Sequence, residues 1–264
     1  MTALLTIATR ANRIRIVGLV RRAFDIVLAG VSLLALAPLL AMIAAAIFAE
    51  SGGPIFFSHR RMGLNGRRFN MHKFRKFHNT CSANGLQLTL ENDARLTRVG
   101  GVLRATKLDE LPQLWNVLVG DMSVIGPRPE SVGYAECFKD GFEQLLIHKP
   151  GILGPSQVHF RDEGALFPGD GDVEQFYCDV LFPMKARIDL EYYSRRSLTK
   201  DLHWLIEGLL ATLRLKKHAC PLDGNWFPDV SPVNGQFAIE PRGRHAAGAK
   251  IHCQPRPGEQ QSGP

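Results

Sequence analysis

The chain has 264 residues, of which 45% are hydrophobic and 22% charged, so it can form one or two domains with a sizeable core; this composition excludes wholesale disorder, collagen and coiled coil. The net charge is +7, but residues 1–78 contain 12 Lys and Arg against two acids, whereas the rest contains 20 against 23. A basic front end that is also the most apolar part of the chain indicates a membrane with anionic lipid before it indicates nucleic acid.

Residues 26–49 form a run of 24 residues without a charge, preceded by a basic segment that we expect to be amphipathic over residues 1–20. About 20 apolar residues suffice to span a bilayer as a helix. A signal peptide is disfavoured because its apolar run is usually only about 7–15 residues long. A buried core helix of a soluble protein rarely lacks charge for so long, so we expect this run to insert into a membrane.

The flanks of the apolar run decide between a straight crossing and a hairpin. Lys and Arg prefer the cytoplasmic side, yet both flanks are basic, with Arg21-Arg22 before the run and Arg60-Arg61 after it. We expect these four residues at anionic headgroups. Pro38 lies in the middle of the run and favours a kink. We therefore predict a re-entrant helix over residues 21–50 that bends at Pro38 and returns to the same face.

A basic hairpin is predicted over residues 55–77, because Asn65-Gly66 is a strong type I′ turn signal between two strand-like stretches. Basic residues alternate there with five phenylalanines. Such a pattern can bind single-stranded nucleic acid, lipid headgroups or phosphates, or form a solvated strand face over aromatic packing.

Further along the chain, residues 79–97 are predicted as a polar loop, and helices are predicted over 99–106 and 109–120, with Asp109 as the cap of the second. Residues 120–130 form a loop made rigid by glycine and proline, residues 131–148 are expected to be helical, and a long helix over 173–215 is expected to break at Pro183.

The five cysteines are odd in number, are widely spaced and contain no CxxC motif, so reduced thiols are expected: Cys81, Cys137, Cys178, Cys220 and Cys253.

Three acidic pairs could carry chemistry: Asp109-Glu110, Asp162-Glu163 and Asp170-Gly171-Asp172. The first is best placed, because a carboxylate at a helix N-terminus stays ionised and an ionised Asp can attack phosphorus. Two adjacent carboxylates need counter-charge, which Mg²⁺ and basic side chains can supply. The candidates for this clamp are Arg104, Arg128, Lys73 and Arg75. The simpler interpretation is an N-cap Asp followed by a solvated Glu.

Three stretches carry a family resemblance: residues 24–63, FNMHKFRKF at 69–77, and LTRVGGVLRATKLDELPQLWNVLVGDMSVIGPRPE at 96–130. They closely resemble the bacterial sugar transferase family, the monotopic phosphoglycosyl transferases that start exopolysaccharide, capsule or O-antigen synthesis. The resemblance covers roughly residues 20–213. The resemblance implies an α+β fold at the inner membrane, with a re-entrant helix broken at Pro38. It also implies a small mixed α/β catalytic domain with interfacial helices on the cytoplasmic side, over residues 51–215. A partly disordered extension is expected over residues 216–264.

The family's catalytic dyad falls on Asp109 and Glu110. The resemblance implies that Asp109 attacks the β-phosphate of a UDP-sugar, releases UMP and forms a phosphosugar-aspartyl intermediate, from which undecaprenyl phosphate takes the phosphosugar. It also implies Mg²⁺ at Asp109, with Glu110 assisting the metal or the proton balance. Phosphate-site positions of the family fall on Arg104 and Arg128, and its basic strand carries Lys73 and Arg75.

One motif departs from the family pattern. Members commonly show PGITGLWQV where residues 150–158 read PGILGPSQV, so Pro155 replaces Leu and Ser156 replaces Trp. This puts the sugar or acceptor contacts of that loop in doubt. About 20 residues precede the resemblance, so the short form of the family is expected, and a homo-oligomer stays open.

Two other functions remain as alternatives. A metal-dependent glycosyltransferase would use Asp170 and Asp172 and release UDP. A membrane-tethered nucleic-acid-binding protein would use the basic hairpin, but it leaves the dyad without a purpose, so no nucleic acid is expected as a partner.

Overall fold

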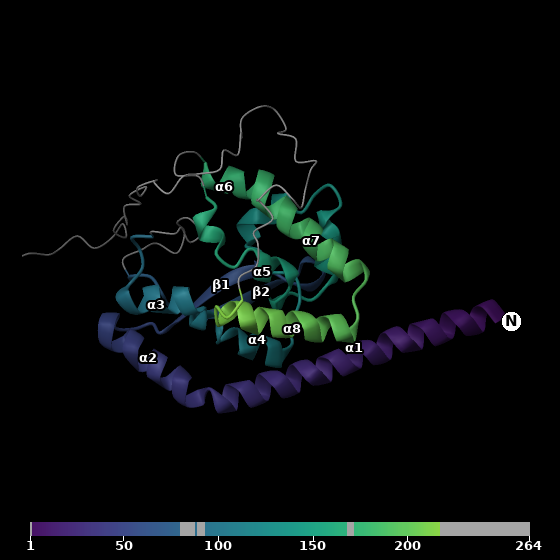
Figure 1. Ribbon diagram of the computed structural model, residues 1–264, viewed down its shortest axis with the longest axis horizontal. Helices are drawn as coiled ribbons and strands as arrows, with labels where there is room; N and C mark the ends of the chain where they lie inside the picture. Colours follow the sequence, from purple (N-terminus) through teal and green to yellow (C-terminus); the bar gives the residue numbers. More distant parts are fainter. Residues whose placement is uncertain (1, 80–87, 89–92, 168–171, 217–264) are drawn as a thin grey trace, which may run out of the picture.

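The structure is a computed structural model that describes residues 2–79, 88, 93–167 and 172–216. A long N-terminal helix runs along one side of a body of helices and short strands (Figure 1). This mixture agrees with the predicted α+β class. The predicted C-terminal extension lies outside the described residues, except for Lys216.

Two consecutive helices, α1 (Thr2–Ala35) and α2 (Ala37–Ser51), contain the charge-free run, and they are bent by 60° where they meet. The break is at Leu36, because Pro38 is accommodated in the first turn of α2, where its missing N–H costs no helix hydrogen bond. The chain before residue 21 continues α1 without interruption. In the described part of the chain no single helix has the length and hydropathy of a membrane span, but this bent pair passes that test together.

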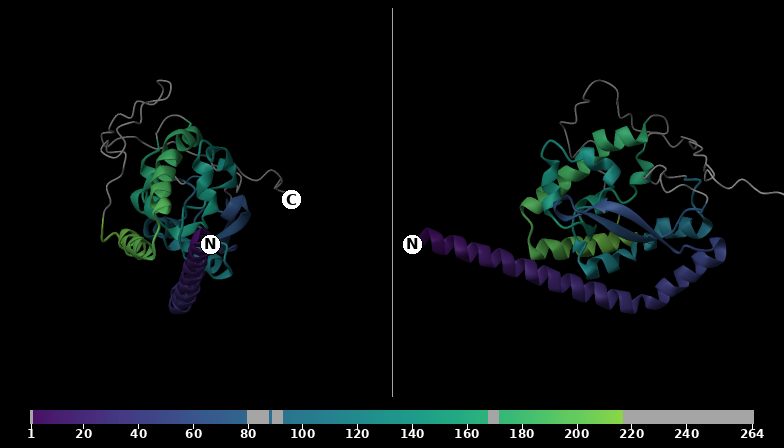
Figure 2. Two further views of the ribbon diagram at one scale, coloured as in Figure 1. Left: turned by 90° about the vertical axis from the view of Figure 1, so that its right-hand side faces the viewer. Right: turned by 180° about the vertical axis from the view of Figure 1, so that it is seen from behind.

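The body is built from a hairpin, a short pair of parallel strands and six further helices of the described chain: β1 (Phe56–Met62), β2 (Arg68–Phe74), α3 (Arg98–Thr106), α4 (Gln113–Val119), β3 (Ser123–Ile125), β4 (Gly151–Leu153), α5 (Pro155–His159), α6 (Val173–Phe176), α7 (Phe182–Ser194) and α8 (Leu198–Thr212). Figure 2 shows the same arrangement from two other sides, with the hairpin crossing the body.

The predicted hairpin is confirmed. β1 and β2 are antiparallel, from Phe56 opposite Phe74 to Met62 opposite Arg68. Asn65 (φ 55°) and Gly66 (φ 73°) both have the left-handed backbone that a type I′ turn requires. The sequence signal therefore found the turn because it is purely local.

Several helix predictions need correction. The helix at 109–120 begins later, as α4, and its N-cap is Pro112, so Asp109 does not cap it. Residues 131–148 form two 3₁₀ turns, Val132–Cys137 and Phe142–Ile147, instead of one helix. Pro183 does not break the long helix, because it lies in the first turn of α7 directly after a π-helical turn. The break comes at residues 195–197, where the Ser197 side chain caps α8.

Polar contacts hold α1 to the body. Arg22 donates to two backbone carbonyls at the end of α4 at 2.6 and 2.8 Å, and Arg21 pairs with Asp201 on α8 at 2.7 Å. Asp25 is buried and accepts hydrogen bonds from β3. Both arginine side chains therefore attach α1 to the body, and their contact with lipid headgroups stays a prediction.

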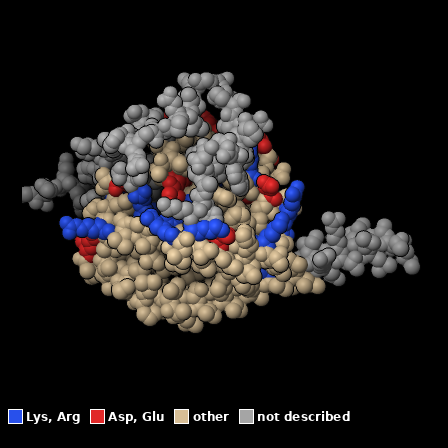
Figure 3. All heavy atoms as spheres, in the orientation of Figure 1, with Lys and Arg blue, Asp and Glu red and all other residues tan. Residues whose placement is uncertain are grey.

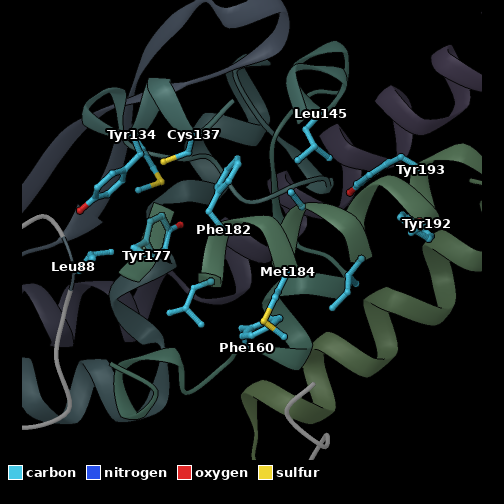
Figure 4. Packing of buried hydrophobic residues seen from close by; sticks show 14 of the residues in the cluster. Leu88, Tyr134, Cys137, Leu145, Phe160, Tyr177, Phe182, Met184, Tyr192 and Tyr193 are labelled. Atoms are coloured by element: carbon cyan, nitrogen blue, oxygen red, sulfur yellow. The ribbon is translucent and has the colours of Figure 1, made fainter. Parts of the chain in front are cut away.

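The main core lies among α4, β3, β4 and α7, and Figure 4 shows part of it. Tyr177 and Leu181 of the π-helical turn are fully buried there. Cys137 and Cys178 form a disulfide in this core, so the expectation of reduced thiols is wrong for this pair. The other three cysteines lie outside the described residues.

A second, smaller apolar cluster joins the end of the bent helix pair to the rest. Ile43 and Ile47 of α2 pack against Phe74 of β2 and Leu103 of α3. The hairpin and α3 are thereby fixed relative to α2. Both elements carry residues of the site described next.

Candidate active site

The six residues predicted from sequence to act on the substrate all lie around one cavity of about 690 Å³. Its walls come from the hairpin, the end of α3 and the following turn, the loop around Arg128, and residues 161–165. The predicted residues on the wall are Lys73, Arg75, Arg104, Asp109, Glu110 and Arg128. In the described chain the lining has ten Lys and Arg against five Asp and Glu, so the cavity suits a polyanion.

Asp109 lies in a 3₁₀ turn, Leu108–Glu110, that directly follows α3. The turn is possible because Lys107 takes a left-handed backbone conformation (φ 61°) and ends α3 there. The Asp109 residue is only 2% exposed, and its Oδ2 lies 3.6 Å from Lys76 Nζ. Burial lowers the pKa of Lys76 to about 8, against the opposing effect of the Asp109 charge. The site thus places a carboxylate oxygen beside a cation on the cavity wall.

Glu110 is held by two cations. Lys73 Nζ on β2 donates to its Oε1 at 2.7 Å, and Arg128 Nη2 lies 3.7 Å from the same oxygen. Burial acts to raise the pKa of Glu110, but the charges of Lys73, Arg128 and Lys107 outweigh it and hold the pKa well below its usual range. Glu110 is therefore an anion that orients the neighbouring cations.

A buried ionic network lies next to Arg128, and its members Glu130 and Glu163 act on the Arg128 charge. Lys185 Nζ lies 3.3 Å from Glu130 Oε1 and 3.0 Å from Glu163 Oε2, and it donates to the Tyr177 hydroxyl at 2.9 Å. The Tyr177 hydroxyl in turn donates to Glu130 at 2.6 Å. Burial alone would lower the pKa of Lys185, but Glu130 and Glu163 together raise it above its usual value. These fixed charges hold the wall that carries Arg128.

A sequence model described as bacterial sugar transferase matches residues 16–215, three quarters of the chain. The chain belongs to the bacterial sugar transferase family.

Three relatives illustrate the family. The chain is 39% identical over 197 residues to the UDP-glucose:undecaprenyl-phosphate glucose-1-phosphate transferase of Xanthomonas campestris pv. campestris, covering 69% of this chain and 36% of the relative. It is 37% identical to the protein of the same name from Escherichia coli K12, covering 70% and 38%. It is 35% identical to the exopolysaccharide production protein PSS of Rhizobium leguminosarum bv. phaseoli, covering 73% and 94%. The chain thus spans little more than a third of the first two relatives and nearly all of the third.

One of the predicted basic residues, Arg75, has structural partners as well as a place on the cavity wall. Arg75 donates to Ser51 Oγ at 2.6 Å and to the carbonyl oxygen of Gly52 at 2.7 Å, and also to the Asn79 side chain. It therefore ties β2 to the end of α2. Arg104 reaches the cavity from the last turn of α3.

Sequence reasoning missed several residues of the cavity. Lys76 was grouped only with the basic hairpin, and the contact with Asp109 that singles it out crosses between distant segments. Arg61, which the basic flank predicts at a lipid headgroup, lines the cavity, and its buried Nε has no hydrogen-bond partner in the structure. The alternation of side chains along β1 puts Phe57, His59 and Arg61 on one face, which is the signal that could have found it.

The departure from the family motif lies away from the cavity. Ser156 is fully buried, its amide donates to Asp189 Oδ1 at 3.1 Å and its hydroxyl donates to Asp189 Oδ2 at 2.8 Å. Neither Pro155 nor Ser156 is among the described residues that line the cavity. The two exchanged residues are therefore part of the protein's packing and not of the cavity wall.

Of the remaining acidic pairs, Asp162 and Glu163 line the cavity, where they pair with Arg161 and Lys185. Asp172 caps α6 by accepting from two backbone amides, and Asp170 lies outside the described residues. Among described residues no group of three or more His, Cys, Asp or Glu could hold a metal ion by itself. Since Mg²⁺ commonly takes one or two carboxylates and completes its shell with phosphate and water, Asp109 fits a Mg²⁺ bound jointly with a substrate.

Proposed function

We propose that this chain transfers a sugar 1-phosphate from a UDP-sugar to undecaprenyl phosphate and releases UMP, as the first step of exopolysaccharide, capsule or O-antigen synthesis. The observation that supports this most directly is the buried Asp109 carboxylate on the wall of a cavity rich in cations. The names of the relatives, which specify a nucleotide sugar and a polyprenyl phosphate, support the same reaction.

In the proposed mechanism an Asp109 oxygen attacks the β-phosphorus of the UDP-sugar. A bond forms between that oxygen and phosphorus, the bond from phosphorus to the UMP oxygen breaks, and UMP leaves with the electron pair. Lys76 beside Asp109 balances charge on the transferred phosphoryl group, while Glu110 keeps Lys73 and Arg128 directed into the cavity. A phosphate oxygen of the acceptor then attacks the same phosphorus and regenerates the Asp109 carboxylate.

Mg²⁺ would be held by Asp109 together with the diphosphate, and it would neutralise phosphoryl oxygens. Glu110 is less suited as a ligand, because its Oε1 is already engaged by Lys73 and Arg128.

The bent pair α1–α2 is proposed to enter the cytoplasmic leaflet and return, with the body on the cytoplasmic face of the inner membrane. Large apolar side chains are exposed along α1, α2, α4 and α8. On the face shown in Figure 3 the lower half of the body is free of charge, and Lys and Arg, with some Asp and Glu, line its upper border. A surface of this kind fits the boundary between acyl chains and headgroups. Labelling of Leu5→Cys and Asn65→Cys with an impermeant thiol reagent tests this arrangement, because a straight crossing would expose the two sites on opposite sides.

The decisive experiment measures UMP release from a panel of UDP-sugars, with undecaprenyl phosphate and Mg²⁺, by wild type and Asp109→Asn. We expect release of UMP and not UDP, and loss of activity in the variant. Asp121→Asn is the matched control, because Asp121 is an exposed acid near α4 outside the cavity lining. Equal turnover by wild type and Asp109→Asn, or UDP as the product, would overturn the proposal.

A further inference from the structure

The C-terminal ends of two helices meet at a single guanidinium group. Arg161 Nη2 donates to the carbonyl oxygen of Ala105 in the last turn of α3 at 3.1 Å and to that of Thr212, the last residue of α8, at 3.2 Å. Its Nη1 pairs with Asp162 at 2.8 Å. Because the last carbonyls of a helix carry partial negative charge, one cation can hold both helix ends together.

Residues at both helix ends also line the catalytic cavity. Arg104 and Ala105 come from the end of α3, and Arg214 comes from the turn after α8. Arg214 has a left-handed backbone conformation (φ 57°), and its side chain is exposed. The cavity therefore reaches the place where the helix ends meet, and a cation lies at its rim.

The outer surface at this place is apolar. Val102 on α3 is 61% exposed, and Leu213 and Leu215 at the end of α8 are 66% and 71% exposed. The exposed apolar row continues along α8 through Leu198, Leu202, Ile206 and Leu209. In Figure 1, α8 lies on the same side of the body as α4 and α1. The rim of the cavity is therefore continuous with the apolar surface proposed to face the membrane.

We propose that a membrane-embedded polyprenyl phosphate reaches the cavity over the part of its rim that is formed by the end of α3 and the turn after α8. Arg214 binds its phosphate at the rim, and Val102, Leu213 and Leu215 contact its isoprenoid chain. This rests on the proposed function and specifies the path of the second substrate. An amphiphile of this kind needs an apolar surface that ends at a cation, and this part of the rim provides both. A nucleotide sugar has no apolar tail and needs no such surface.

Separate measurement of the two half-reactions tests the assignment. Exchange of labelled UMP into UDP-sugar reports formation of the aspartyl intermediate without an acceptor, and product formation reports transfer to undecaprenyl phosphate. In Arg214→Glu we expect kcat/KM for the acceptor to fall about fivefold more than the exchange rate, since one exposed charge pair contributes about 1 kcal/mol. Lys200→Glu is the matched control, because Lys200 is an exposed cation on α8 outside the cavity lining, and it should change both rates equally.

Crosslinking supplies a readout independent of turnover. A photoreactive group at position 102 or 213 should crosslink to a polyprenyl phosphate, and one at Leu34 of α1, which is even more exposed, should do so far less. The assignment is overturned if wild type is active but Arg214→Glu and Lys200→Glu raise the acceptor KM alike. It is also overturned if Arg214→Glu weakens only binding to phosphatidylglycerol vesicles, which would make Arg214 a phospholipid contact. Absence of UMP exchange in wild type would instead contradict the proposed function itself.

Discussion

Gly100 is the point at which α3 touches the segment that carries Lys76, and its replacement by Ala offers a sharp test of how the site is held. A Cβ at Gly100 would lie 1.9 Å from the carbonyl oxygen of Lys76 and 2.7 Å from its carbonyl carbon. At the neighbouring Gly101 a Cβ meets no atom within 4 Å. Because carbon and oxygen approach no closer than about 3.3 Å, Gly100→Ala must push the helix and the Lys76 backbone apart by roughly 1.4 Å.

The two substitutions have the same chemistry and differ only in this overlap. Each gains about 1 kcal/mol from helix propensity. Overpacking costs about 1–3 kcal/mol, and the upper end applies at Gly100 because the obstacle is backbone and cannot rotate away. We therefore expect Gly100→Ala to be less stable than Gly101→Ala by about 3 kcal/mol, or about 6–12 °C in Tm for a chain of this size.

Thermal unfolding of both variants in detergent measures this difference, and UMP release measures the effect on the site. Gly100→Ala should also lose activity, because the shift moves Lys76 away from Asp109. Gly101→Ala should keep wild-type activity. Equal Tm and equal activity in the two variants would show that α3 does not pack on Lys76 as described.

Two further substitutions test contacts through their pH dependence. Glu50 on α2 accepts hydrogen bonds from the first two amides of α3 at 2.8 and 3.1 Å; together with the hydrogen bond from Thr97 they outweigh the effect of burial and lower the pKa of Glu50. Glu50→Ala should cost about 1 kcal/mol of stability at neutral pH, as the loss of other helix caps does. The difference in Tm from wild type should disappear as the pH falls below about 4, and a difference independent of pH would contradict the charged cap. Burial raises the pKa of Asp189 to about 7 against the hydrogen bonds from Ser156, so the native state keeps a proton that the unfolded chain has lost. The stability that this bound proton gives the native state is complete below about pH 4 and is lost as the pH rises toward 7. The Tm of Asp189→Asn should therefore fall less between pH 5 and pH 8 than the Tm of wild type. Parallel curves of Tm against pH would refute the raised pKa of Asp189.

The parts of the fold that were predicted correctly depend on neighbours in the chain. The turn at Asn65-Gly66 needs only two residues that tolerate positive φ, and the apolar run is visible without knowledge of its partners. The dyad and its four basic companions were found because they belong to continuous motifs, and all six lie on one cavity wall. Their roles in catalysis stay predictions.

What the sequence could not provide are contacts between distant segments. The pairing of Arg21 with Asp201 joins residues 180 positions apart, and no local pattern distinguishes it from an arginine at a lipid headgroup. Likewise, the disulfide joins Cys137 to Cys178 across 41 residues, and wide spacing alone favoured free thiols. Lys107 has a left-handed backbone conformation, which turns the chain and places Asp109 on the cavity wall. A sequence pattern predicts this conformation mainly at glycine, so it gave no signal at a lysine.

The C-terminal end of α2 contacts both segments that lead to Asp109 and Glu110. Arg75 ties that end to β2, the strand that carries Lys73, and Glu50 ties it to the first amides of α3. Since α3 leads directly into the turn that holds Asp109, both sides of the dyad are positioned from the same helix end. In the proposed membrane arrangement, α2 then fixes the height of Asp109 above the bilayer. A lipid-borne acceptor requires this, because its phosphate can approach phosphorus only at the depth that its own anchor allows.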